Sequence, residues 1–244
     1  MPSPAPSSSA KSRDGAARKR RVVHEQDLHA VEHRFSRAQW LAEVLQQRII
    51  SGAYQPGEHL REAQLRQEFG FSNGPIREAL QKMVLDGLAE SEPWQGVRVK
   101  QLSERQIVEL FQVRLALLEY AAELAARNVS PEMQKSGAAV KRGLDQGFSE
   151  IDASAGHLSF NGKLSQWLVA SAGNEALREI WDKTMRQTLI YVNASMKRSL
   201  DGKSRGHIHA LIDGICGGDV KGARAAARAL TQQTLLDLGI DQTV

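Results

Sequence analysis

Residues 60–88 read LREAQLRQEFGFSNGPIREALQKMVLDGL, and this stretch predicts two short helices joined by a tight turn. Leu65 and Phe69 lie four residues apart on the apolar stripe of the first helix. Gly70 is expected to end that helix, because a residue without Cβ readily takes the left-handed conformation of a C-terminal cap. Pro75 falls in the first turn of the second helix, where its missing N–H costs nothing. This order is typical of a helix-turn-helix, with an ordinary helical hairpin as the alternative.

The second helix is expected to bury one stripe and to leave its polar residues outside. The expected buried residues are Ile76, Ala79, Leu80 and Met83, and the outward ones are Arg77, Glu78, Gln81 and Lys82. Working outward, 37–51 has a helical period, and 88–90 and 97–99 are short strand candidates around a polar turn that ends at Gly96. Three helices followed by two strands is the winged-helix arrangement, which favours DNA binding over the plain hairpin.

The remainder of the chain has a helical period and no strand pattern. Ser103 and Gln106 form a capping-box signature at its start, whereas residues 132–148 are only weakly patterned. The predicted fold is therefore mainly α, with an N-terminal winged helix-turn-helix followed by an all-α antiparallel helical bundle. We expect a disordered basic arm over 1–35, a DNA-binding domain over 36–103, and a helical effector-binding and dimerisation domain over 104–238.

Composition limits the classes of function. The 244 residues carry a formal charge of +4, so nucleic-acid affinity requires a local basic patch rather than a polycation. A single cysteine, Cys216, excludes an intrachain disulfide and fits a reducing cytoplasm, and no apolar run is long enough for a membrane span. For the basic stretch between Lys11 and Arg21, phosphate contact and a merely solubilising tail remain alternatives.

Several motifs resemble one family in the family's own order. PGEHLRE and GFSNGPIREALQKMVLDGLAE, followed by the Gly96 wing, resemble the winged helix of GntR-type bacterial transcription regulators. FQVRLALLEYAAELAAR, ASAGNEAL and ALIDGICGGDVKGARAAA resemble the effector domain (FCD type) of the FadR subfamily. The resemblance spans about residues 38–236. It implies a homodimer that binds a palindromic operator in double-stranded DNA, with a small molecule in the helical domain altering the DNA affinity.

The resemblance also indicates which residues contact DNA, and where this chain departs from its relatives. Ala63 and Asn73 stand where the family commonly has arginines, which predicts an unusual operator. Asn73 either reads an adenine or only caps its helix. The candidate DNA-binding residues are Arg61, Gln64, Ser72, Asn73, Gly74, Arg77, Gln81, Gln95 and Gly96.

Many members of the subfamily hold a divalent metal through one aspartate and three histidines. The same alignment places His157, Asn161, Ile208 and Leu230 at those four positions, and two of these side chains cannot coordinate a metal. We therefore expect no metal and no cofactor. A shift of one residue would instead turn His207 or His209 inward.

Arg114 falls on the apolar stripe between Phe111 and Leu117, where a charge has to be paired. It is either the partner of an anionic effector or half of a buried ion pair, with Asp213 or Glu119 as the other half. The candidate effector-binding residues are Arg114, His157, Asn161, His207 and His209.

The expected function is that of a DNA-binding transcription regulator, more often a repressor in this family, controlled by a small metabolite that bears a carboxylate. An effector-independent architectural DNA-binding dimer is the alternative. An enzyme is the rival from another class, but no nucleophile–base pair or ligand cluster occurs at a useful spacing, so no catalytic residue is assigned.

Overall fold

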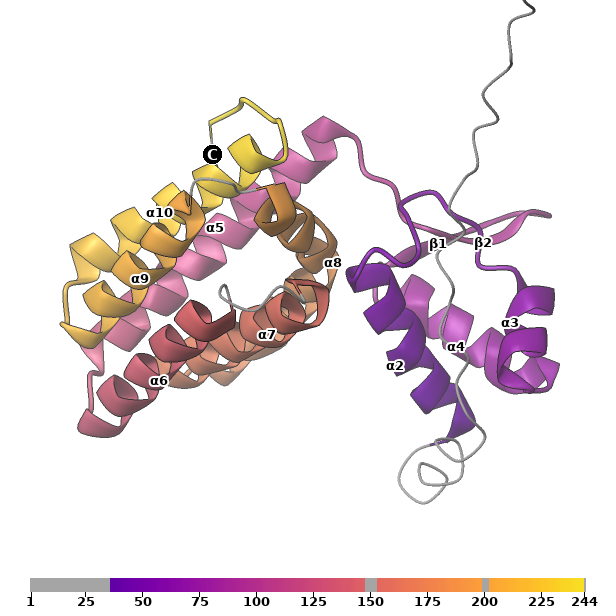
Figure 1. Ribbon diagram of the computed structural model, residues 1–244, viewed down its shortest axis with the longest axis horizontal. Helices are drawn as coiled ribbons and strands as arrows, with labels where there is room; N and C mark the ends of the chain where they lie inside the picture. The colour runs from indigo at the N-terminus through magenta and orange to yellow at the C-terminus, as the bar shows by residue number, and fades with distance from the viewer. Residues whose placement is uncertain (1–35, 148–152, 199–201, 244) are drawn as a thin grey trace, which may run out of the picture.

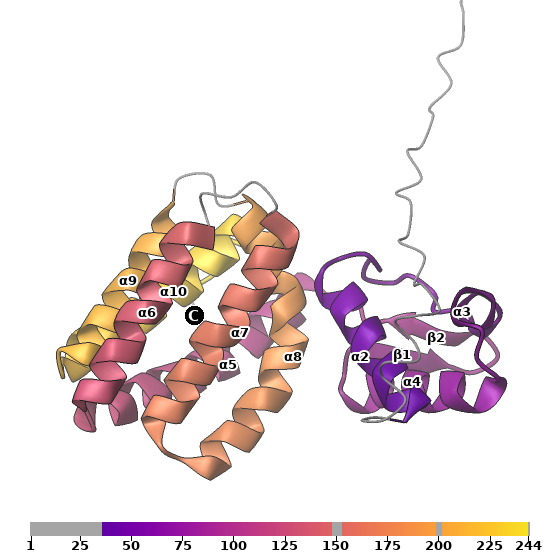
Figure 2. The same cartoon turned by 60° about the horizontal axis from the view of Figure 1, so that its bottom comes forward.

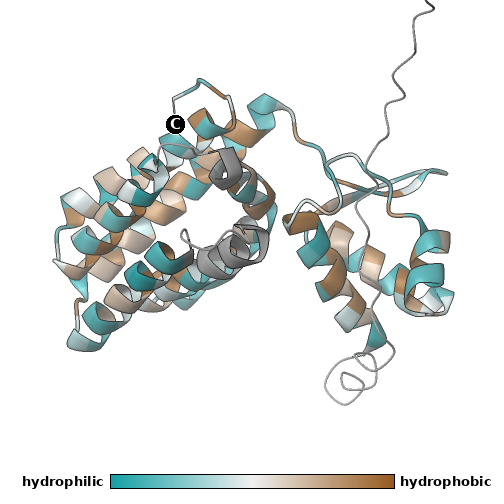
Figure 3. Ribbon diagram, in the orientation of Figure 1, coloured by the Kyte–Doolittle hydropathy of each residue, from teal (hydrophilic) through white to brown (hydrophobic). Residues whose placement is uncertain are grey.

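The computed structural model describes residues 36–147, 153–198 and 202–243, with only the backbone described over 153–161 and 196–198. The predicted basic arm, 1–35, lies outside the described residues. The chain forms a winged-helix unit and a helical bundle that lie side by side (Figures 1 and 2). In both units the apolar residues recur along each helix with polar residues between them (Figure 3). The predicted fold class is confirmed.

The winged-helix unit has the predicted order of three helices and two strands. Its elements are α2 (Arg37–Ile50), α3 (Glu62–Phe69), α4 (Asn73–Leu85), β1 (Ala89–Glu92) and β2 (Gly96–Val99). The strands pair antiparallel, with Ala89 opposite Val99 and Glu92 opposite Gly96. An isolated bridge between His59 and Arg98 adds a short third segment to this sheet, which the sequence pattern did not predict.

The turn of the helix-turn-helix is formed as predicted. Gly70 has a φ of 67° and its N–H donates to the Arg66 carbonyl at 2.9 Å, so it ends α3 in the left-handed conformation. Ser72 is the N-cap of α4, although its side chain makes no capping hydrogen bond. Asn73 is already the first helical residue. The alternative that Asn73 caps the helix is therefore wrong.

The bundle has six helices in the described residues. These are α5 (Glu104–Arg127), α6 (Pro131–Gly147), α7 (Ala153–Ala172), α8 (Glu175–Arg198), α9 (Lys203–Cys216) and α10 (Val220–Asp237). The predicted Ser103–Gln106 capping box is present at the start of α5. Residues 132–148, weakly patterned in the sequence, fall largely within a regular helix of 17 residues, α6.

Helix α8 is the part of the bundle that contacts the winged-helix unit. Arg186 lies 3.6 Å from the carboxylate of Asp86, the residue that ends α4. Asn193 donates its side-chain N–H to the Ile50 carbonyl at the end of α2, at 3.2 Å. The Tyr191 hydroxyl accepts from the backbone N–H of Leu102 at 3.3 Å, between β2 and α5. The two units are thus joined by side-chain contacts as well as by the chain.

Candidate DNA-binding surface and effector cavity

The predicted DNA-binding residues lie on the surface of the helix-turn-helix and of the wing. All nine are exposed: Arg61, Gln64, Ser72, Asn73, Gly74, Arg77, Gln81, Gln95 and Gly96. The core beneath them is apolar, and it includes Leu45, Ile76 and Met83, each fully buried. Helix α4 therefore presents a polar face outward while a rigid core fixes its position, which is the arrangement that places a recognition helix in the major groove.

Arg77 is an exposed cation of this face that also pairs with a carboxylate. Its side chain is 68% exposed, and its Nε donates to the Glu62 carboxylate on α3 at 3.1 Å. The ion pair holds the guanidinium across the turn between the two helices. An exposed pair of this kind contributes little stability, so Arg77 is available to bind a phosphate or a guanine.

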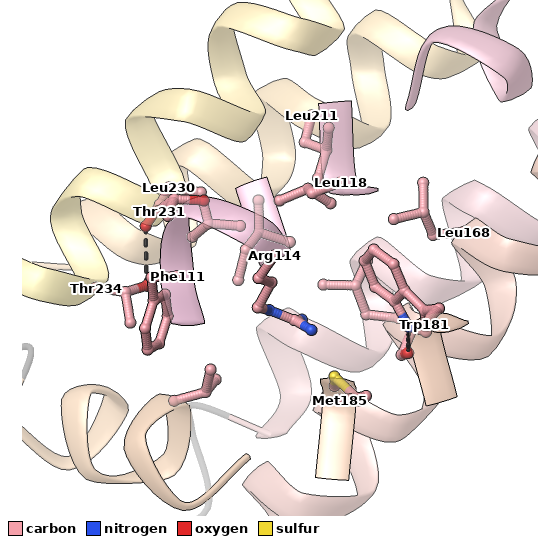
Figure 4. Close-up of a pocket in the computed structure, with 14 residues that line it drawn as sticks. Phe111, Arg114, Leu118, Leu168, Trp181, Met185, Leu211, Leu230, Thr231 and Thr234 are labelled. Atoms are coloured by element: carbon pink, nitrogen blue, oxygen red, sulfur yellow. Dashed lines mark hydrogen bonds between the residues drawn. The ribbon is translucent and has the colours of Figure 1, made fainter. Parts of the chain in front are cut away.

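The bundle holds a small, partly open cavity of about 60 Å³. Its lining comes from α5, α7, α8, α9 and α10, and Figure 4 shows how the labelled side chains converge. The lining residues are Phe111, Arg114, Leu118, Leu164, Ser165, Leu168, Trp181, Met185, Val192, Ile208, Leu211, Leu230, Thr231 and Thr234. Most are apolar, which is usual for a site that binds a small molecule.

Arg114 brings a positive charge into this apolar cavity. Its guanidinium carbon lies 4.8 Å from the centre of the Trp181 ring, and Figure 4 shows the side chain pointing toward Trp181 and Met185. The Nη1 atom is buried and has no hydrogen-bond partner among the side chains that the structure describes. Burial lowers the pKa of the Arg114 guanidinium to about 10, so the group remains a cation at neutral pH.

The expected ion-pair partners of Arg114 are engaged elsewhere. Asp213 pairs with Lys141 at 2.6 Å, and Glu119 accepts from Arg224 at 3.0 Å and from Arg228 at 2.5 Å. The interpretation of Arg114 as half of an ion pair with Asp213 or Glu119 is therefore wrong. Pairings between helices so distant in sequence leave no mark in the periodicity of either helix.

The hydroxyl groups of the cavity are satisfied within the protein. Thr231 and Thr234 donate to backbone carbonyls one turn earlier on α10, at 3.0 and 2.9 Å. The Ser165 hydroxyl accepts from the Trp181 ring N–H at 2.5 Å. The guanidinium of Arg114 is thus the one lining group, among those the structure describes, that remains short of a hydrogen-bond partner.

Two of the four residues aligned with the family's metal ligands are placed by the structure. Ile208 and Leu230 do line the cavity, as the alignment requires, and neither can coordinate a metal. Within the described ranges no group of three histidine, cysteine, aspartate or glutamate residues could hold a metal ion. The described part of this donor set does not fit a metal.

The remaining predicted effector residues have different outcomes. His157 and Asn161 lie on α7, in the stretch whose side chains fall outside the described residues. His207 and His209 do not line the cavity, because Ile208 between them takes the inward position. His209 instead lies 3.0 Å from the Asp145 carboxylate on α6. The alternative alignment, shifted by one residue so that His207 or His209 points inward, is therefore wrong, and the unshifted alignment with Ile208 inward is the one that the structure has.

A winged helix with an exposed polar recognition helix, joined to a second, helical domain, is the architecture of a DNA-binding regulator. The chain belongs to the gntR family of bacterial regulatory proteins and carries an FCD domain: the model "Bacterial regulatory proteins, gntR family" matches residues 37–99, and the model "FCD domain" matches residues 109–233. The resemblance noted in the sequence is confirmed.

Relatives and solved structures agree with this family. A Paenarthrobacter nicotinovorans protein described as a probable D-xylose utilization operon transcriptional repressor is 30% identical over 70% of this chain and 75% of its own. The Bacillus subtilis transcriptional regulator YdhC is 26% identical over 56% of this chain, and the match spans 61% of YdhC. The structure of Escherichia coli McbR/YncC is 22% identical in sequence and superposes with a TM-score of 0.70. The match covers 84% of this chain and 98% of the McbR/YncC chain, and it supports the fold. The protein is a DNA-binding transcription regulator, and none of its described helices is long and apolar enough to cross a membrane.

Proposed function

We propose that this regulator is a repressor that binds a palindromic operator as a homodimer and changes its DNA affinity when a small carboxylate-bearing metabolite binds in the bundle. The sign of regulation is supported by the D-xylose repressor above and by a gluconate operon repressor of Bacillus licheniformis, 37% identical over 34% of this chain. The single observation that carries the effector is the buried Nη1 atom of Arg114, which has no hydrogen-bond partner among the described residues, in an apolar cavity.

The chemistry of the cavity supports an anion with an apolar body. A buried cation without a partner is costly, and a carboxylate can meet a guanidinium through two parallel hydrogen bonds. The surrounding leucine, phenylalanine and tryptophan side chains gain by covering a hydrocarbon part of the ligand. Such a ligand would therefore be stabilised at both ends without a metal ion.

Helix α8 supports a route from this cavity to the DNA-binding face. Trp181 and Met185 line the cavity, and Arg186, the next residue, pairs with Asp86 where the recognition helix α4 ends. Gln187 packs so closely on Gly87 that an added β-carbon there would overlap its side chain. A ligand that contacts Met185 would act on the helix that holds α4. A shift or bend of α8 would alter the placement of the recognition helix.

An apolar stripe on α5 supports the homodimer. Val113 is 53% exposed and Tyr120 is 48% exposed, and their spacing of seven residues puts them on one face of the helix. Large apolar side chains at this exposure are a common feature of subunit interfaces. A two-fold dimer would present two recognition helices to a palindrome.

The DNA-binding part is tested with a duplex that the wild-type protein selects from a pool of random sequences. Arg77→Ala is expected to abolish the gel shift of this duplex while leaving the unfolding temperature unchanged. Arg178→Ala, an exposed arginine on α8 that pairs only with Glu175 in the described contacts, is the matched control and should bind normally. A normal shift with Arg77→Ala would contradict the assigned recognition helix.

The effector part is tested by a thermal-shift screen of short monocarboxylic acids on the same protein. A ligand raises the unfolding temperature by mass action, and a true effector must also change the gel shift. If no acid across a broad set stabilises the protein, the architectural dimer becomes the better account of the bundle.

A further inference from the structure

A cleft much larger than the cavity around Arg114 lies where the bundle meets the winged-helix unit. This interdomain cleft has a volume of about 580 Å³, and it is lined by Gln46, Gln47 and Ile50 of α2 and by residues of α7 and α8. Figures 1 and 2 show α2 beside α8 at this junction. Small-molecule sites usually measure roughly 300–1,000 Å³. The cleft therefore has the size of a metabolite site, whereas the cavity, at about 60 Å³, has room only for a small group of atoms.

The cleft and the cavity meet at two side chains. Ser165 of α7 and Met185 of α8 are both buried, and each lines the cavity as well as the cleft. The Ser165 hydroxyl is held by the ring N–H of Trp181, so Met185 is the side chain that is free to move. Methionine is unbranched and has three rotatable bonds, which lets it adapt its shape. A rotation of Met185 would join the cavity and the cleft into one continuous site.

The cleft also has polar groups that the fold leaves without partners. Four of its side chains form no hydrogen bond or ion pair with any residue that the structure describes: Gln46, Gln47, Gln166 and Asp182. The Nε atom of Arg186 is buried and makes no hydrogen bond in the described chain, because the Asp86 carboxylate is 3.6 Å away. A buried donor without a partner is costly, so a ligand oxygen atom beside Arg186 would be stabilised.

We propose that the effector occupies the cavity and the cleft together. Its carboxylate meets Arg114, its hydrocarbon part passes Met185, and its far end makes hydrogen bonds to α2 and to Arg186 in the interdomain cleft. This inference rests on the proposed function and narrows its ligand class to extended monocarboxylates whose far end carries hydroxyl or carbonyl oxygens. A short acid touches the bundle alone, whereas such a chain bridges the bundle and the winged-helix unit.

The reach from the cleft to Arg114 can be measured without knowing the effector. Gln47→Cys combined with Cys216→Ser gives the full chain a single thiol, on the α2 side of the cleft. Straight-chain carboxylates of graded length, each with a methanethiosulfonate group at the other end, are attached to this thiol as disulfides. Chains too short to pass Met185 should leave the unfolding temperature unchanged. Longer chains should raise it by about 3 °C or more, because a tethered carboxylate has a high effective concentration at Arg114.

Three controls show whether the carboxylate and its route cause the rise. Adding Arg114→Met to the labelled protein should remove the rise, and so should a chain of equal length that ends in a methyl group. Gln67→Cys, also with Cys216→Ser, is the matched attachment site, since Gln67 is an exposed glutamine of α3 that does not line the cleft. Figure 1 shows α3 on the side of the winged helix that faces away from the bundle, so no length attached there should raise the unfolding temperature.

Each other outcome overturns the proposal in a recognisable way. No rise at any length, or a rise that persists with Arg114→Met, would show that the cleft does not lead to Arg114. A rise with the shortest chain as well as the longest would place the anion site within the cleft itself. Free butanoate separates these failures from a failure of the proposed function. If butanoate stabilises the wild type but not Arg114→Met, the anion site in the bundle stands although the bridging ligand does not. If neither butanoate nor any tethered chain stabilises the protein, both proposals fail.

Discussion

Replacing Arg114 by methionine tests the electrostatics of the cavity directly. Burial lowers the pKa of the guanidinium to about 10, which is roughly 2.5 below its ordinary value. At about 1.36 kcal/mol for each pKa unit, holding the charge in the cavity costs the folded protein about 3 kcal/mol. The attraction between the guanidinium and the Trp181 ring, 4.8 Å away, offsets about 0.5–2 kcal/mol of this cost, and the variant loses it.

The net effect expected for Arg114→Met is therefore a gain of about 1–2 kcal/mol in the free energy of unfolding. For a chain of this length that gain corresponds to a rise of roughly 3–6 °C in the unfolding temperature. Because the folded pKa is lowered, the full penalty applies at every pH below about 10 and is relieved only as the pH rises through that value. Thermal unfolding at pH 7 followed by circular dichroism is a suitable measurement.

Arg48→Met is the matched control. The Arg48 guanidinium also lies over an aromatic ring, 4.9 Å from the centre of Phe69, but it pairs with the Glu68 carboxylate at 2.6 Å. Methionine there would leave a half-buried carboxylate unpaired, so the unfolding temperature should fall. If Arg114→Met also lowers it, Arg114 has a charge partner and the argument for an anionic effector is refuted.

Three further changes test the coupling, the packing and the assembly. Asp86→Asn should keep operator binding within a fewfold but weaken its response to any carboxylate effector, as read by gel shift. Gly214→Ala would bring a β-carbon to 2.8 Å from the backbone of α10, and it should lower the free energy of unfolding in urea by about 1–3 kcal/mol. Gly206→Ala on the same helix, with open space around it, should not. Tyr120→Asp should give monomers in analytical ultracentrifugation, and an unchanged dimer would exclude the α5 stripe as the interface.

The winged helix was predictable because local chemistry marks its boundaries. Gly70 and Pro75 define the turn whatever the rest of the chain does, and the capping boxes and alternating strands follow from short-range rules. Helix α6 was harder for a physical reason. Its inward positions are Met133 and Leu144, which are buried, and Val140, which is partly buried, with a glycine, Gly137, where a fourth apolar residue would complete the stripe. An added β-carbon at Gly137 would lie 2.7 Å from the sulfur of Cys216, so the close packing requires glycine there. The glycine interrupts the apolar stripe from which a helix is predicted.

The cavity was predictable only in part. Its walls come from five helices spread over more than 120 residues, and Ile208 and Leu230 were located by the family alignment rather than by periodicity. On α9, a shift of one residue decides whether Ile208 or one of its neighbours His207 and His209 points inward. The mixed apolar and polar composition of this helix does not determine that register. The conformation of Trp94, exposed in the turn between β1 and β2 with a positive φ, could not be predicted from the residue type, because this turn position favours glycine or asparagine.

The connection between the two units has a mechanical consequence. Residues 100–103 alone separate β2 from α5, and the Leu102 N–H in that link is bonded to Tyr191 of the bundle. Four residues have about eight soft dihedral angles, and the hydrogen bond restrains some of them. We therefore expect this link to be stiff, so that it can absorb little of a small displacement of α8. We also expect a shift of α8 to reach the winged helix as a rotation of the whole unit, which displaces the far tip of the wing most.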